Sequence, residues 1–203
     1  MIRVIVSPEY PSFDADVRRP GKAFLASCPE PNSDQFKKKN LWTRAAGQLH
    51  IAYSGICAYT AMYLPEQGTV DHFLPKTAYP AQAYEWSNFR LASGRINTYK
   101  GNSTDIVDPF VVDNDWFHLD LPGCLLKPNP GLEQAIRDRV TRTIKLLRLN
   151  QDDNYVQGRC DILMDFARGD VSIGFLQRRY PFLAKEVSRQ ALASDSLRRL
   201  FGF

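Results

Sequence analysis

Residues 68–102 read GTVDHFLPKTAYPAQAYEWSNFRLASGRINTYKGN, and this stretch decides the fold. Its first part, residues 68–74, is rich in β-branched and aromatic side chains, which favour a short strand that ends at Pro75. A loop follows, and residues 88–92 form a second run of strand length. Ser93 is a good N-cap for a helix behind that run. The pattern therefore predicts two short strands followed by a helix.

Four side chains in this stretch suit the metal-assisted cleavage of a phosphodiester bond. Asp71 and Asn97 offer oxygen ligands for a hard divalent cation. His72 offers a base whose usual pKa lies near neutrality, and Lys100 offers a positive charge for a phosphate oxygen. Each of these residues alone is more often structural than functional. Their occurrence together, in this order and spacing, indicates hydrolysis at phosphorus.

The order Asp-His, Pro-Lys, Tyr-x-Trp-x-Asn and Asn-x-x-Lys-Gly resembles the HNH endonucleases, whose active site lies on a ββα-metal finger. The likeness covers residues 56–105, and VDHFLPK and YEWSN are its most specific pieces. The nine-residue step from Asn88 to Asn97 is also that of the HNH domain in the CRISPR RNA-guided DNA nuclease. The resemblance implies an α+β fold, with a ββα-metal (HNH) finger embedded in a mainly helical small protein.

The resemblance also implies a role for each residue of the signature. His72 would be the general base that activates water, and Asp71 with Asn97 would hold one divalent ion, Mg²⁺ or Mn²⁺ in its place. Asn88 would pin the loop and orient His72, and Lys100 would lie near the scissile phosphate. Because the third signature position is asparagine rather than histidine, the site would be an H-N-N variant.

Two further side chains are candidates for nucleic-acid binding beside Lys100. Lys76 follows Pro75 in the loop after the strand that carries His72. Arg95 belongs to the same predicted helix as Lys100. We expect both to contact the phosphate backbone, because such contacts supply most of the affinity of nucleic-acid-binding proteins.

Many small HNH proteins frame the finger with a structural zinc held by two CxxC pairs. The corresponding positions here run from Cys57 to Thr60 and from Ser93 to Ile96, and only Cys57 is a good ligand. A structural zinc needs four such ligands. We therefore expect no structural zinc, with apolar groups such as Tyr59 and Ile96 packed in its place.

The rest of the chain is predicted to support this finger. We expect an N-terminal arm and helix that pack on the core, then the nuclease core, then a mainly helical C-terminal subdomain, over residues 1–55, 56–110 and 111–203. Five prolines in residues 7–34 indicate an extended arm, since proline opposes regular helix. Ser33 is the expected N-cap of a helix over residues 34–53.

Three helices are expected toward the C-terminal end. The first begins with Pro130 and carries an apolar stripe at three- and four-residue spacing. The second, capped by Asp152 or Asp153, ends at Gly169, and the third covers residues 182–193.

Composition restricts the setting in which the protein works. The 203 residues carry a formal net charge of +4, a mild basic bias that is compatible with a polyanionic partner but does not require one. The sequence has no apolar run of the ~18 residues that a membrane span needs. The first residues, MIRVIVSPEYPSF, lack the apolar core of a signal peptide, and the four cysteines form no CxxC pair. We expect a cytoplasmic protein with free thiols.

The sequence leaves three functions open. The first is a metal-dependent HNH endonuclease, a phosphodiester hydrolase that acts on DNA. The second is a non-catalytic nucleic-acid-binding or assembly module with an HNH-like shape, which the loss of the zinc ligands motivates. The third is an RNA nuclease. In size and layout the chain is similar to the small HNH nucleases of the bacterial Septu and retron-associated defence systems. That likeness implies an anti-phage defence effector with an ATPase or other defence-system protein as partner.

Overall fold

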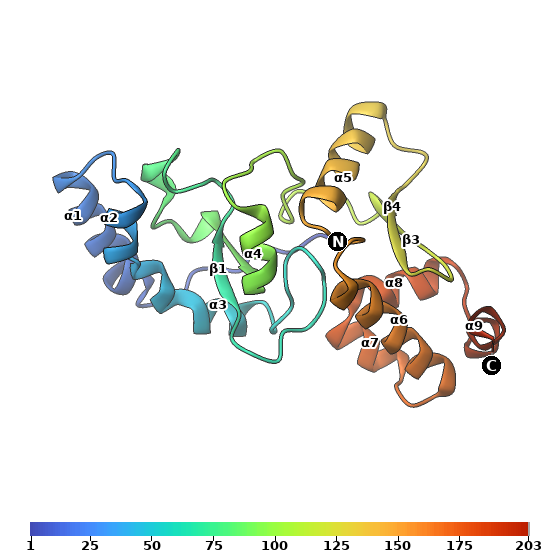
Figure 1. Cartoon of the computed structure of the whole chain (residues 1–203). Coiled ribbons are helices and arrows are strands. Elements are labelled where there is room, and N and C mark those ends of the chain that lie inside the picture. The colour runs from blue at the N-terminus through green and yellow to red at the C-terminus, as the bar shows by residue number, and fades with distance from the viewer. Residues whose placement is uncertain (203) are drawn as a thin grey trace. The chain divides into compact units, whose positions relative to one another are not determined.

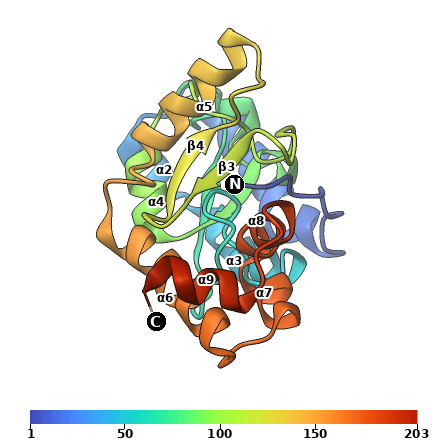
Figure 2. The ribbon, with the colours of Figure 1, turned by 90° about the vertical axis from the view of Figure 1, so that its right-hand side faces the viewer.

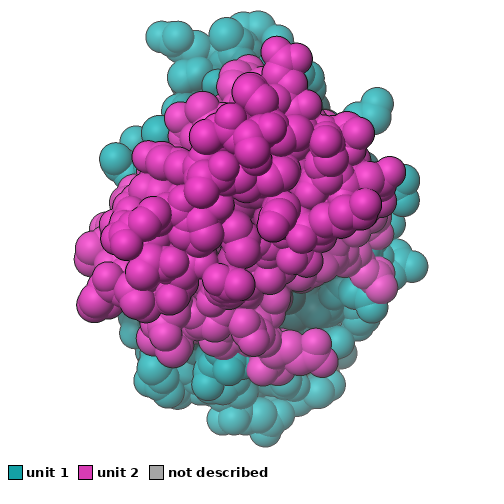
Figure 3. Space-filling view, turned by 90° about the vertical axis from the view of Figure 1, so that its left-hand side faces the viewer, with its two compact units in different colours: residues 1–4, 59–63, 105–203 teal, residues 5–58, 64–104 magenta. Residues whose placement is uncertain are grey.

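The computed structural model describes residues 1–202, so Phe203, the last residue of the predicted C-terminal subdomain, lies outside it. The described chain forms two units (Figure 3), which alternate along the sequence. Unit 1 comprises residues 1–4, 59–63 and 105 onward, and unit 2 comprises residues 5–58 and 64–104. Helices and small antiparallel sheets make up both units, so the α+β class is confirmed.

The centre of unit 2 is a pair of short strands followed by a helix, as predicted. Strand β1 (Thr69–His72) pairs antiparallel with β2 (Phe89–Ala92), in a register that sets His72 opposite Phe89. Helix α4 (Gly94–Lys100) follows directly, and the Ser93 side chain caps it by accepting a hydrogen bond from the backbone N–H of Ile96. Helix α4 packs beside β1 (Figure 1). Two short 3₁₀ turns, Pro80–Gln82 and Trp86–Asn88, lie in the loop that joins the strands.

The predicted extended arm is wrong for much of residues 7–34, because this segment is largely helical. A π-helical stretch (Asp14–Arg18) leads into α1 (Arg19–Ser27). Phe13, Val17 and Gly21 recur every four residues and are buried, which is the spacing of one helical face. Proline is tolerated in the first turn of a helix, and Pro20 lies in that position in α1. The prediction relied on the number of prolines, but a proline in the first turn does not oppose a helix. The position of each proline therefore decides whether a helix can form.

The single helix predicted over residues 34–53 is also wrong, because three shorter elements replace it. These are α2 (Ser33–Lys38), a 3₁₀ turn η2 (Leu41–Ala45) and α3 (Ala46–Ala52). The cap of α2 is Asn32 rather than Ser33, and it forms a capping box with Gln35. Residues 37–40 are KKKN, and all four are exposed. The break falls there, since no apolar side chain favours continuing the helix.

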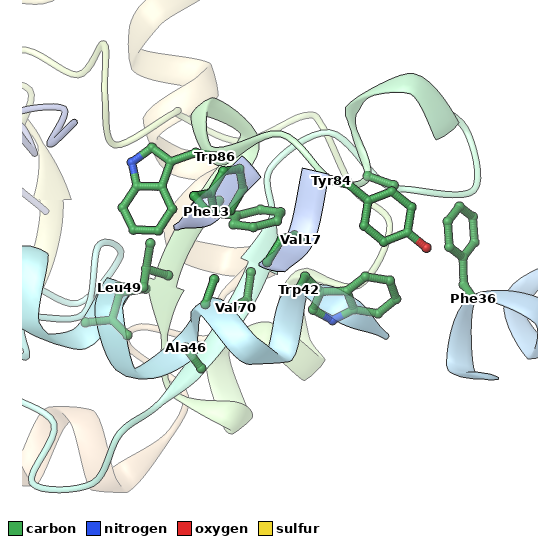
Figure 4. Packing of buried hydrophobic residues seen from close by; sticks show 13 residues of the cluster. Phe13, Val17, Phe36, Trp42, Ala46, Leu49, Val70, Tyr84 and Trp86 are labelled. Atoms are coloured by element: carbon green, nitrogen blue, oxygen red, sulfur yellow. The ribbon is translucent and has the colours of Figure 1, made fainter. Parts of the chain in front are cut away.

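The core of unit 2 is rich in aromatic side chains from the N-terminal helices and from the β1–β2 loop. Figure 4 shows Trp42, Tyr84 and Phe36 near one another on one side of this cluster, and Trp86 and Phe13 on the other. Most neighbouring rings meet edge to face, as Phe13 and Trp86 do at 5.5 Å. Edge-to-face rings attract one another beyond the area they bury, so this core can fix the loop against the helices.

Unit 1 contains a β-hairpin that was not predicted. Strands β3 (Phe117–Asp120) and β4 (Leu125–Pro128) pair antiparallel, and Figure 2 shows the hairpin with α5 (Gln134–Leu146) along β4. The prediction that α5 begins at Pro130 is wrong, because its N-cap is Glu133. The Asn129 side chain accepts a hydrogen bond from the N–H of Gly131 and forms a turn there instead.

The remaining helices of unit 1 are α6 (Asp153–Arg168), α7 (Ile173–Arg179), α8 (Pro181–Arg189) and α9 (Ser194–Phe201). Helix α6 is capped by Asp152 and ends at Gly169 in the left-handed conformation, as predicted. The predicted last helix, over residues 182–193, stops at Arg189, and α9 follows it. In residues 1–202 none of the helices has the length and apolarity that crossing a lipid bilayer requires.

Candidate active site

Three of the five predicted residues of the signature, Asp71, His72 and Asn97, line a small polar cavity of about 130 Å³ in unit 2, whereas Asn88 and Lys100 lie behind its walls. Its walls come from η2, from β1 with the loop after it, and from α4 with the residues that follow. The side chains that line it include Trp42, Asp71, His72, Lys76 and Asn97. Positions far apart in sequence therefore share one cavity.

Asp71 lies on β1 and forms a buried ion pair with Lys100, which lies in the last turn of α4. The Lys100 Nζ is 3.1 Å from Asp71 Oδ1 and donates a 2.6 Å hydrogen bond to the backbone carbonyl of His72. The side chains of Lys100 and Asp71 are 0% and 2% exposed. Buried charges are stable only when paired in this way. To reach a phosphate, the Lys100 ammonium would have to leave Asp71, so its predicted phosphate contact stays a prediction.

His72 is held on three sides. Its Nε2 lies 2.9 Å from the backbone carbonyl of Ala83, and its ring meets those of Trp42 and Phe89 edge to face at 4.9 Å and 5.3 Å. A carbonyl only accepts, so Nε2 carries the hydrogen and Nδ1 is the acceptor in the neutral ring. Burial first of all, together with the charges of Lys76 and Lys100, lowers the pKa of His72 to about 3 against the opposing bond to Ala83. The imidazole is therefore neutral, with Nδ1 as its acceptor.

Asn88 joins the two ends of the loop between β1 and β2. Its Nδ2 donates to the carbonyls of Leu74 and Gln82 at 3.0 Å and 3.1 Å, and its Oδ1 accepts from the Leu74 N–H at 2.8 Å. These bonds fix the start of the loop to the segment that precedes Ala83, the residue that accepts from His72. Asn88 thus acts on the site through the backbone.

Asn97 lies on α4 with its amide turned toward β1. Its Nδ2 donates to Thr69 Oγ1 at 3.1 Å and to the Val70 carbonyl at 3.2 Å. Both amide hydrogens are used by these acceptors, so the side chain offers its oxygen to the cavity that it lines with Asp71. A carboxylate and an amide oxygen are the donor types that Mg²⁺ and Mn²⁺ prefer.

The two residues predicted to bind nucleic acid beside Lys100 differ in their surroundings. Lys76 lines the cavity, half-buried, with its Nζ 5.2 Å from the centre of the Trp42 ring. Burial lowers the pKa of Lys76, and the nearby Asp71 opposes this while Lys100 adds to it. Arg95 is exposed on the first turn of α4. The cavity and the adjoining surface therefore each carry one of the predicted cations.

Two groups at this cavity were not predicted. Trp42 was predicted only to lie within the helix over residues 34–53, although its ring contacts both His72 and Lys76. The Ala83 carbonyl fixes the His72 ring, but a backbone group has no signature in the sequence. An aromatic residue thirty positions before His72 also gives no spacing signal, because only the tertiary fold brings them together.

Three of the four positions that were compared with zinc ligands lie in unit 2: Cys57 and Ile96 pack in its interior, and Ser93 caps α4. Cys57 and Ile96 are fully buried, and the N–H of Ala58 donates to the Leu91 carbonyl of β2 at 2.8 Å. In residues 1–202 no three His, Cys, Asp or Glu side chains form a group that could hold a metal ion.

No protein-family model and no curated protein matches this chain.

Proposed function

We propose that the chain is a metal-dependent endonuclease of the HNH type that hydrolyses DNA phosphodiester bonds, with the unit 2 cavity as its active site. The observation that supports this best is the meeting of Asp71, His72, Asn97 and Lys76 at one cavity. They combine two oxygen ligands, a neutral base and a cation, which is the set of groups that hydrolysis at phosphorus uses. The order β1, β2, α4 is also that of a ββα-metal finger, which we propose these elements form.

The donor set fits one hard divalent cation. Asp71 and Asn97 would hold it, and Mg²⁺ is commonly bound by one or two carboxylates together with water and substrate phosphate. Lys100 keeps the Asp71 carboxylate in place through their ion pair. When bound, the ion supplies electrostatic stabilisation of the negative charge that develops on the phosphate oxygens.

The other residues of the cavity would handle the water and the phosphate. His72 Nδ1 accepts the proton of the attacking water, because its bond to the Ala83 carbonyl fixes the tautomer. Asn88 holds the loop that carries this carbonyl. The Lys76 ammonium lies at the cavity and binds a phosphate oxygen, and Arg95 on the exposed surface of α4 binds the backbone beyond it. The net charge of +4 favours a polyanionic substrate.

The biological setting is also a proposal. The likeness in layout to defence-system HNH nucleases suggests an anti-phage effector that works in the cytoplasm with an ATPase or another defence protein. Phosphodiester chemistry does not select the sugar, so RNA must be tested beside DNA.

A cleavage assay tests the proposal. Purified protein is incubated with supercoiled plasmid and, in parallel, with RNA of matched length, in Mg²⁺, in Mn²⁺ and in a chelator. We expect metal-dependent nicking or cutting of DNA. His72→Ala should lower the rate by about 10²–10⁴-fold, the usual contribution of a general base. Asp71→Asn should abolish the metal-dependent cleavage, because it removes the proposed carboxylate ligand of the ion.

His50→Ala is the matched control, because His50 belongs to the same unit but bonds to the Gln67 carbonyl and does not line the cavity. It should cleave like the unmodified protein. Undiminished cleavage by His72→Ala would refute the mechanism. Salt-dependent DNA binding without cleavage in either metal would identify the non-catalytic module instead.

A further inference from the structure

We propose that Trp42 is a positioning residue of this active site, which holds both the His72 imidazole and the Lys76 ammonium. The inference rests on the proposed function, and it assigns a role to a residue outside the stretch that resembles HNH proteins. The N-terminal helices would then complete the site rather than only cover it.

Trp42 limits the freedom of the His72 ring. The two ring centres are 4.9 Å apart at an angle of 85°, and Phe89 meets the imidazole at 5.3 Å and 83°. The Ala83 carbonyl holds Nε2 as a third contact. A hydrogen bond alone permits the ring to tilt about its axis, whereas two perpendicular aromatic neighbours oppose such rotation. Together they fix where Nδ1 lies.

The same indole also contacts Lys76. The Lys76 Nζ is 5.2 Å from the ring centre, within the range of an attractive cation–π interaction. Asp71, which lines the same cavity, also attracts the Lys76 ammonium. The aromatic face of Trp42 adds a second favourable contact, so the indole helps to keep this ammonium at the cavity.

Trp42 is itself fixed from the side away from the cavity. Its ring is 6.1 Å from that of Phe36 on α2 and 5.8 Å from that of Tyr84 in the β1–β2 loop. Figure 4 shows these three rings together at one side of the aromatic cluster. Trp42 is 9% exposed, and η2 begins directly after the break between α2 and α3. The indole is thus held between the aromatic cluster and the cavity that it lines.

The first test separates kcat from KM. Trp42→Leu removes the aromatic face, and Trp42→Phe keeps a smaller one. We expect Trp42→Leu to lower kcat by about tenfold, because His72 is less well aligned, and to raise KM for DNA as Lys76 loses its support. Trp42→Phe should have kcat and KM values much closer to those of the unmodified protein. Tyr10→Leu is the matched control: Tyr10 packs against the same aromatic cluster, where its ring meets those of Phe13 and Trp86 rather than Trp42 or His72, so its kinetic constants should stay near normal.

The second test does not need nuclease activity. The chain has three histidines, so a long-range ¹H–¹⁵N spectrum of the imidazoles contains three patterns, with His50 and His118 as internal references. We expect the unmodified protein and Tyr10→Leu to show His72 as a single Nε2–H tautomer. In Trp42→Leu the His72 pattern alone should shift or become a mixture of tautomers.

The two tests separate the failure of the inference from the failure of the proposed function. A protein that cleaves no nucleic acid but shows the His72-specific change overturns the nuclease and leaves the positioning contact supported. Unchanged His72 signals in Trp42→Leu, or an equal change in Tyr10→Leu, overturn the role of Trp42 even if the protein cleaves DNA. Where Trp42→Leu does not fold, the same comparison is made with Trp42→Phe, whose smaller ring should give a smaller shift confined to His72.

Discussion

Asp71 in unit 2 and Glu186 in unit 1 are both buried carboxylates paired with a cation, and they differ in their neighbours. In unit 2, Asp71 pairs with the enclosed Lys100 and lines a polar cavity. In unit 1, the side chain of Glu186 is fully buried, accepts from the Leu119 N–H at 2.7 Å, and accepts two bonds from Arg189 at 2.7 Å and 3.0 Å. Both satisfy the requirement that a buried charge be paired.

The difference shows what marks a candidate active site. Burial and an ion pair are common to both carboxylates, so neither feature indicates function by itself. Glu186 joins β3 to α8 through backbone and guanidinium donors, which is a structural task. Asp71 instead shares its cavity with a neutral histidine and with Asn97, whose amide nitrogen is used by Thr69 and Val70. A chemical role is therefore supported by the polar groups that share a cavity with a buried charge, and not by the buried charge alone.

The largest effect on stability is expected for Lys100→Met. The substitution leaves Asp71 buried with one cation fewer, and removing one partner of a buried pair costs about 3–5 kcal/mol. Urea unfolding followed by circular dichroism measures the change in the free energy of unfolding.

The double variant Asp71→Asn/Lys100→Met is the control, because it removes both charges together. Its loss of stability should be clearly smaller than the sum of the two single losses. A loss below about 1 kcal/mol for Lys100→Met, the size expected of an exposed pair, would contradict the enclosed ion pair.

A smaller loss of stability, and no loss of cleavage, is expected for Glu186→Gln. Hydrogen bonds to charged groups contribute about 1.5–3 kcal/mol, and Arg189 is 33% exposed, so it can return to water. The free energy of unfolding should fall by about 2 kcal/mol. The exposed Glu66, changed to Gln, should shift it by less than about 0.5 kcal/mol. Loss of cleavage by a folded Glu186→Gln protein would show that Glu186 also supports activity, so the two carboxylates would no longer differ in role.

Gly21→Ala tests how far the N-terminal helices support the active-site loop. A Cβ at Gly21 would lie 2.2 Å from Tyr84 Cγ and 2.7 Å from Tyr84 Cβ, so the tyrosine must move. Tyr84 follows Ala83, whose carbonyl holds His72. We expect a loss of about 1–3 kcal/mol from overpacking, together with slower cleavage.

Gly174→Ala is the matched control for this substitution. A Cβ at Gly174, in α7, would meet only the flexible end of Arg178 at 3.5 Å and Ser172 Oγ at 3.7 Å. It should therefore stabilise the protein by about 0.4–1 kcal/mol, as alanine does in an accommodating helix. Equal behaviour of the two variants, measured by urea unfolding and plasmid cleavage, would show that the Gly21–Tyr84 contact does not constrain the loop.

The parts of the fold that were predicted correctly depend on local signals. The two strands and α4 lie within residues 68–102, where β-branched residues, Pro75 and the Ser93 cap each act on neighbouring positions. The cap at Asp152 and the stop at Gly169 are local in the same sense. The sequence also singled out Asp71, His72 and Asn97, which the structure brings to one cavity.

The parts that were missed depend on contacts between distant segments. The helical face formed by Phe13, Val17 and Gly21 has only three members, and neighbouring prolines obscured it. The β3–β4 hairpin is stabilised in part by Glu186 from α8, which lies 67 positions from Leu119. Trp42 likewise meets His72 only after the N-terminal helices have packed on the loop. Local propensity carries no information about such pairs.

The smallest expected effect is a change with pH in the difference in unfolding free energy between the unmodified protein and Glu186→Gln. Burial raises the pKa of Glu186, but the bonds from Arg189 and Leu119 and the charge of Lys185 lower it more, so it lies below the usual 4.5. Since the folded pKa is the lower one, the charged carboxylate stabilises the fold above the unfolded pKa, and this is lost as the pH falls through the folded value. Urea unfolding of both proteins at about pH 7 and about pH 3.5 should show a smaller difference in unfolding free energy at the lower pH. The other carboxylates titrate alike in both proteins, so they do not change this difference. A constant or wider gap would show that Glu186 is not held as an ionised structural group, and the contrast with Asp71 would then need another basis.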